Sequence, residues 1–154
     1  MKKSAVHSRS GIFLMEIIIA ILLFSLVSAV CLQAFTKAHN MSAESAEMNK
    51  AISLTTNMAE LAQDLDSPEA VLTAGEGDVQ NNRLVVGYNE DWEQCDMYDS
   101  SCVYLLMAEY NQVPDSPNLT SWDLAVIKKH GKPGTDSSQD DVIYGLTTEV
   151  YYGK

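Results

Sequence analysis

The sequence lacks the short motifs that mark the common classes of catalytic site. It contains no G-x-S-x-G nucleophile elbow, no phosphate-binding P-loop and no H-E-x-x-H zinc motif. Its three histidines, His7, His39 and His130, are scattered, and two thiolates without a nearby histidine fall short of the four ligands of a structural zinc site. We therefore expect a protein that is not an enzyme.

Basic residues are scarce after the first eleven positions. Lys2, Lys3 and Arg9 precede Gly11 with no acid among them, which leaves seven basic groups against all 21 carboxylates in the rest of the chain, a net charge near −14. So acidic a surface repels phosphate backbones. Direct binding to nucleic acid is therefore not expected.

Proline is absent before Pro68, and no other breaker interrupts the helical pattern that starts at Ile12. The first part of this predicted helix, residues 12–35, reads IFLMEIIIAILLFSLVSAVCLQAF and has Glu16 as its only charge. About 20 apolar residues in a helix span the hydrocarbon core of a membrane. Basic residues before such a span favour a cytoplasmic N-terminus, so the acidic remainder is expected outside the cytoplasm.

Several kinds of apolar segment fit this composition. A cleaved secretory signal has a core of about 7 to 15 residues, which is shorter than this one. A lipoprotein signal ending at Cys31 fits poorly, because a small residue is expected where Val30 stands. A plain single-pass anchor, carrying a binding or sensor domain that does not polymerise, is the alternative, and it explains everything except Glu16.

Glu16 is the informative residue of the segment. A carboxylate in a membrane helix costs about 2.5 to 3.5 kcal/mol at the centre and less near an interface, so it is expected to have a partner. Cleavage after Gly11 would create an amine on Ile12, four residues or one helical turn from Glu16. That amine could pair with Glu16 of its own chain or of a neighbouring chain.

The stretch from Gly11 to Ile21, with its short basic leader, terminal glycine, apolar helix and glutamate fifth after the glycine, resembles the signal of type IV prepilins and pseudopilins. The resemblance implies that a membrane prepilin peptidase cuts after Gly11 and methylates Ile12, and that Glu16 aligns incoming subunits by pairing with a terminal amine. It also implies, as partners, other pilin-like subunits, an assembly platform protein in the membrane, and membrane lipid. The expected product is a minor subunit of a pilus or of a secretion-type fibre.

Four regions are expected along the chain. Residues 1–11 form the cleaved cytoplasmic leader, 12–35 the membrane and assembly half of the helix, 36–66 its amphipathic half, and 67–154 a β-rich headgroup outside the cytoplasm. In the amphipathic half, one side is predicted to be covered, and its apolar or small residues recur every three or four positions: Met48, Ile52, Thr55, Ala59, Ala62 and Leu65. Asp66 is the expected cap of a short helix that follows, with Glu69 as its capping-box partner.

The headgroup pattern predicts an α+β fold, in which the long N-terminal helix packs against a small antiparallel sheet of three to four strands in meander order. The strands are expected at residues 83–88, 103–110, 122–129 and 142–152, with Val142, Tyr144, Leu146 and Val150 on one side of the last strand. A headgroup on a long helix is similar to the pilin fold.

Two features of the headgroup bear on ligands and crosslinks. Cys95 and Cys102 can form a disulfide if the headgroup is exported, adding about 2 to 3 kcal/mol, and two free thiols are the alternative. Cys31, in the apolar span, is expected to behave as a small hydrophobe. No bound cofactor is expected, although Asp136, Asp140 and Asp141 form a weak candidate site for calcium.

Overall fold

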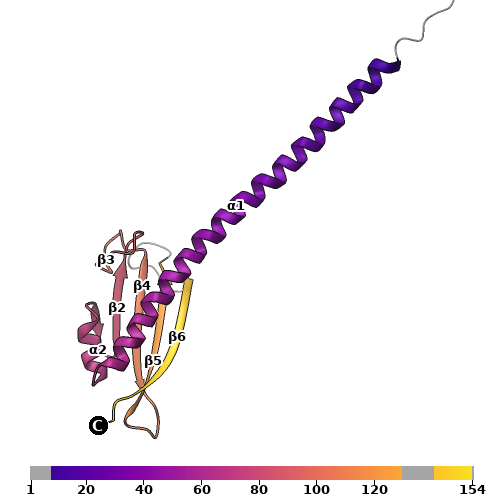
Figure 1. Cartoon of the computed structure of the whole chain (residues 1–154). Coiled ribbons are helices and arrows are strands. Elements are labelled where there is room, and N and C mark those ends of the chain that lie inside the picture. Colours follow the sequence, from indigo (N-terminus) through magenta and orange to yellow (C-terminus); the bar gives the residue numbers. More distant parts are fainter. Residues whose placement is uncertain (1–7, 130–140, 154) are drawn as a thin grey trace, which may run out of the picture. The chain divides into compact units, whose positions relative to one another are not determined.

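The computed structural model describes residues 8–129 and 141–153, with side chains from Gly11 onwards. Two helices and six strands follow one another along these residues (Figure 1): α1 (Ser8–Asp64), α2 (Pro68–Ala74), β1 (Asp78–Gln80), β2 (Arg83–Tyr88), β3 (Gln94–Cys95), β4 (Tyr104–Gln112), β5 (Leu119–Lys128) and β6 (Asp141–Tyr151). The fold is α+β, as predicted. It divides into two compact units, Met1–Ser45 and Ala46–Lys154, which are described separately below.

The first unit contains the first part of α1. Proline is absent, and the residues are mainly aliphatic side chains and alanines, so nothing interrupts the backbone hydrogen bonds. Every large apolar side chain from Ile12 to Phe35 is exposed. This helix is therefore apolar on all sides, which is typical of a helix that needs a membrane or other helices around it.

The second unit is built around one antiparallel sheet. Its strands follow the order β1-β2-β4-β5-β6, and β3 pairs with β2 beside β1. The meander order is as predicted, but six strands replace the three to four expected. The additional strands, β1 and β3, have three and two residues, which is too short for an alternating pattern to show in the sequence.

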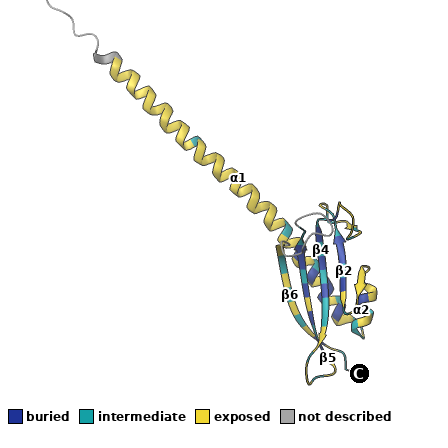
Figure 2. Ribbon diagram, turned by 180° about the vertical axis from the view of Figure 1, so that it is seen from behind, coloured by how far each residue is buried: buried dark blue, intermediate teal, exposed yellow. Residues whose placement is uncertain are grey.

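Residues 46–64 of α1 pack on one face of this sheet and share a core with α2 (Figure 2). Because side chains alternate along a strand, every second residue of the central strands points to the helix. Trp122 on β5 is fully buried. The core consists of these buried residues: Ala51, Met58, Ala59, Ala62, Val71, Leu72, Leu84, Val86, Leu106, Ala108, Trp122, Leu124, Val126 and Val150.

The predicted covered side of the helix is right at Thr55, Ala59 and Ala62, which are buried, and wrong in its first turns. Met48 and Ile52 were expected to be covered but are 40% and 37% exposed, while Ala51 and Met58 are buried. The small side chain of Ala51 lets the helix approach the sheet closely there. The side of the helix that faces the sheet is therefore centred on Ala51 and not on the larger side chains of Met48 and Ile52. Thr55 is buried as expected, and its hydroxyl donates a hydrogen bond to the Ala51 carbonyl at 3.0 Å.

Two local predictions in this unit are wrong. Ser67, and not Asp66, caps α2, since the Ser67 hydroxyl oxygen accepts a hydrogen bond from the Ala70 N–H at 3.3 Å. Val142 is 65% exposed, because a bulge makes β6 skip one residue between the partners of Val126 and Ile127. The extra residue turns Val142 away from the side that Tyr144 occupies.

Candidate functional site

The predicted processing position lies near the start of α1. The described part of the helix starts at Ser8, so the bond between Gly11 and Ile12 lies within the helix. Ile12 is 67% exposed, and a Cβ placed on Gly11 would meet no atom within 4 Å. Glycine weakens helix formation because it has the most conformational freedom to lose. This peptide bond is therefore accessible, and the helix is weaker beside it than next to a residue with a side chain.

Glu16 lies one turn further along the same helix, about 6 Å from Ile12 along the axis at 1.5 Å per residue. Its side chain is exposed, as are those of the apolar residues around it. The next acid along the chain is Glu44 and the first base is Lys37. The carboxylate is thus the single charge on a long apolar surface, one helical turn from the position where an amine would lie if the chain were cut after Gly11.

Residues 12–35 are long enough to cross a membrane. Twenty-four helical residues measure about 36 Å, against a hydrocarbon core of about 30 Å. Among the described residues, one helix near the N-terminus meets the requirement of length and apolar composition for a membrane span.

The structure brings Cys95 and Cys102 together in the second unit. Cys95 ends β3 and is partly buried, and Cys102 is buried shortly before β4. Both thiols are free. The pKa of the Cys95 thiol is raised to about 11, because burial disfavours the thiolate and the neighbouring thiol of Cys102 adds to this effect.

The calcium candidate is only partly within the described residues. Asp136 and Asp140 lie outside them, and Asp141 begins β6 opposite Lys128. In the described ranges, no group of three or more histidine, cysteine, aspartate or glutamate residues could hold a metal ion.

A polar cluster that the sequence did not predict joins α1 to the sheet. Tyr104 and Lys128 both donate hydrogen bonds to Oε1 of Glu47, at 2.9 and 2.8 Å. The Lys128 ammonium also lies 5.5 Å from the centre of the Tyr104 ring. The indole of Trp92 stacks on the same tyrosine ring, with 4.1 Å between the two ring centroids. Glu47 is not among the helix residues predicted to be covered, and its partners are 57 and 81 residues away, so no local signal could reveal the cluster.

This cluster shifts the titration of its members. Burial alone would raise the pKa of Glu47, but the hydrogen bonds from Lys128 and Tyr104 outweigh burial and lower it. The pKa of Lys128 is raised by its hydrogen bond to Glu47. A glutamate with a lowered pKa in the folded state stabilises the fold above its unfolded pKa, and this contribution is lost as the pH falls through the folded pKa.

Replacing Glu47 with Gln is expected to destabilise the second unit by about 1 kcal/mol at pH 7, because the ion pair with Lys128 is lost and the charged acceptor becomes a neutral amide oxygen. The difference from wild type should shrink as the pH falls below 4.5, the ordinary pKa of this carboxyl group. Thermal unfolding of the full chain in detergent at pH 7 and at acid pH measures both effects. Glu44→Gln is the matched control, since Glu44 is an exposed acid one turn earlier. Equal stabilities of the two variants at pH 7 would contradict the assignment.

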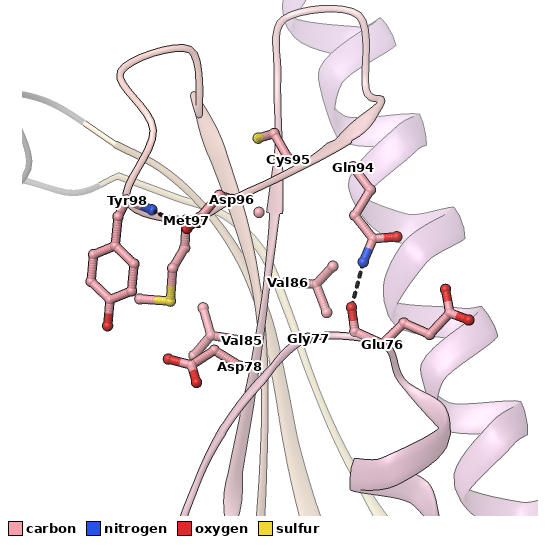
Figure 3. A pocket seen from close by; sticks show the side chains of 11 residues that line it. Glu76, Gly77, Asp78, Val85, Val86, Gln94, Cys95, Asp96, Met97 and Tyr98 are labelled. Atoms are coloured by element: carbon pink, nitrogen blue, oxygen red, sulfur yellow. Dashed lines mark hydrogen bonds between the residues drawn. The ribbon is translucent and has the colours of Figure 1, made fainter.

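The second unit also contains a cavity of about 410 Å³ at the β2 edge of the sheet, between β1 and β3 (Figure 3). The Gln94 side chain donates a hydrogen bond to the Glu76 carbonyl across it. Three carboxylates, those of Glu76, Asp78 and Asp96, stand among the eleven lining residues, and none of the eleven is basic.

No family model, curated protein or solved structure that was compared with the chain matches it. A function can therefore be proposed only from the residues described above.

Proposed function

We propose that the chain is a fibre subunit similar to type IV pilins and pseudopilins, held in the membrane by residues 12–35 before it assembles. The observation that carries this proposal is the position of Glu16, one helical turn beyond an accessible Gly11–Ile12 bond, on a helix whose large apolar side chains from Ile12 to Phe35 are all exposed. An acid there gains a partner only if an amine comes close to it. Cleavage after Gly11 supplies one.

The orientation follows from charge. Lys2, Lys3 and Arg9 keep the leader in the cytoplasm. The rest of the chain, with a net charge near −14, then places the second unit on the other side of the membrane. There the sheet and α2 form the headgroup. A prepilin peptidase in the membrane then removes the leader and methylates the amine of Ile12.

Assembly moves the helix from lipid into a bundle of like helices. The exposed side chains between Ile17 and Phe35 then pack against those of neighbouring subunits, delivered by an assembly platform protein in the membrane. Glu16 pairs with the terminal amine of a neighbour and so sets the displacement between subunits along the fibre. The role is structural and not catalytic.

A membrane-anchored binding domain that does not polymerise is the second candidate. The acidic cavity between β1 and β3 favours it, because a hollow of about 410 Å³ with three carboxylates suits a cationic ligand. This candidate requires no cleavage and gives Glu16 no role.

Mass spectrometry of the N-terminus separates the two candidates. We expect the chain purified from membranes of its own host to begin at an N-methylated Ile12, because the peptidase has removed the leader. A Gly11→Val variant, in which the open position beside the bond is filled by a branched side chain, should keep the leader, and Gly145→Ala, a change at an exposed glycine of β6, should be processed normally. A wild-type chain that retains Lys2 and Lys3 in cells with an active peptidase would refute the fibre proposal.

A further inference from the structure

Cys95 and Cys102 flank a turn at one end of the sheet, and both lie against the end of β2. Cys95 pairs in register with Gly87 of β2. After the turn, the Val103 N–H donates a hydrogen bond to the Tyr88 carbonyl at 2.9 Å, so the chain returns beside the same strand. The two cysteines therefore approach each other from opposite ends of the turn.

Gly87 shows how closely the two cysteines are packed. A Cβ at this position would lie 2.7 Å from the Cys95 carbonyl oxygen, closer than real Cβ atoms come, and 3.0 Å from Sγ of Cys102, closer than most of them come. Glycine is thus the residue that lets both cysteines come against the strand. Figure 3 shows Cys95 among the residues that line the cavity, whereas Cys102 is 6% exposed.

The turn between the cysteines is already ordered by its own hydrogen bonds. Asp96 accepts one from the Tyr98 N–H at 2.9 Å, and Asp99 accepts one from the Ser101 N–H at 3.1 Å. The Asp99 N–H in turn donates to the Asp96 carbonyl at 3.0 Å. Folding has therefore ordered this segment before any covalent bond closes it, and little further ordering opposes ring closure.

We infer that Cys95 and Cys102 form an intrachain disulfide when the folded headgroup meets a disulfide-bearing oxidant, and that Cys95 reacts first because it is reachable from the cavity. The Cys95 sulfur attacks the oxidant's disulfide, and one thiol leaves with the Cys95 proton. The Cys102 sulfur then displaces the second thiol, which takes the Cys102 proton. Two protein thiols are oxidised, and one disulfide of the oxidant is reduced to two thiols.

The disulfide would crosslink the two ends of the turn that forms one wall of the cavity. Asp96, Met97 and Tyr98 line the cavity and belong to the turn that the two cysteines enclose. Met97 is also held by Lys129, whose ammonium donates to its carbonyl at 2.9 Å. In the cell, oxidation rests on the proposed function, because only an exported headgroup reaches an oxidising compartment.

The pairing is tested on the full chain in detergent, carrying Cys31→Ser to prevent bonds between chains. The reduced protein is incubated with oxidised glutathione, remaining thiols are alkylated, and peptides are mapped without reduction. We expect the peptides of Cys95 and Cys102 to be linked and two hydrogen atoms lighter, and the melting midpoint of the second unit to rise by about 10 °C. Alkylation of both thiols after this treatment would overturn the inference.

The order of reaction is tested on single-cysteine variants in the same background. Cys102→Ala, which keeps the accessible thiol, should capture glutathione at least about tenfold faster than Cys95→Ser, which keeps the buried one. Equal or reversed rates would overturn the order. Circular dichroism of both variants verifies that they are folded.

Peptide mapping of wild-type protein from host membranes separates this inference from the proposed function. Linked peptides there support both the pairing and the export of the headgroup. Free thiols in the membranes, from a chain that glutathione does crosslink after purification, would count against export and leave the pairing intact. Failure to crosslink after purification overturns the pairing wherever the headgroup lies.

Discussion

Replacing Glu16 with Ala is expected to leave the chain in the membrane but to lower its incorporation into fibres by more than about tenfold. A charge-assisted hydrogen bond contributes about 1.5 to 3 kcal/mol, and each 1.4 kcal/mol is about a factor of ten in an equilibrium constant. The loss should be greater where the pair is shielded from water by the surrounding helices. The measurement is the amount of variant in sheared surface fibres relative to the amount in membranes.

Matched variants distinguish the charge from other effects of this substitution. Glu16→Gln keeps the size of the side chain and should show most of the defect, whereas Glu44→Ala removes an exposed acid of the same helix outside the apolar run and should show none. Cleavage after Gly11 is measured in each variant, so that a processing defect is not mistaken for an assembly defect. Wild-type incorporation of Glu16→Ala would refute the pairing role and favour the anchored binding domain.

Replacing Trp122 with Ala is expected to destabilise the second unit by about 4 kcal/mol, a large share of the 5 to 15 kcal/mol typical of a whole domain. Trp122 is fully buried on β5, at the centre of the core. Its indole N–H donates to the Tyr152 hydroxyl at 3.0 Å, and that hydroxyl donates to the Ala62 carbonyl of α1 at 2.8 Å. The substitution therefore opens a cavity and also removes a link between sheet and helix.

Trp122→Phe serves as the graded comparison and should lower the free energy of unfolding by less than half as much as Trp122→Ala. The phenyl ring fills much of the space, and the Tyr152 hydroxyl keeps its bond to Ala62, so no donor is left unpaired. Unfolding of the full chain in detergent is followed by fluorescence, for which Trp92 is the sole remaining tryptophan in both variants. If Trp122→Ala unfolds within about 1 kcal/mol of wild type, the core does not depend on this contact.

Much of the fold could be predicted because its patterns are long. The apolar run and the absence of proline predicted α1, and alternation bounded by turn residues predicted β2 at its observed bounds, Arg83–Tyr88. The phase of the helix could not be predicted as well. With alanine and threonine at many positions, several faces are about equally apolar, and the close approach to the sheet at Ala51 decided among them.

The candidate residues divide in the same way. Gly11, Ile12 and Glu16 could be proposed from the sequence because their relation is a spacing along one helix, and their roles stay predictions. The Glu47 cluster could not, since its partners meet only after β4 and β5 have paired in register. Cys95 and Cys102 are intermediate: their separation allowed a bond, but their contact depends on β3, a strand too short to predict.

The cluster of Glu47 with Tyr104 and Lys128 has a mechanical consequence. In a fibre of the proposed kind, tension would enter the second unit at Ala46, one residue before the two hydrogen bonds on Glu47. Behind them, Ala51, Thr55, Met58 and Ala62 are buried along the same helical segment. A force along this segment would load their contacts in shear, so that they would yield together and not one after another.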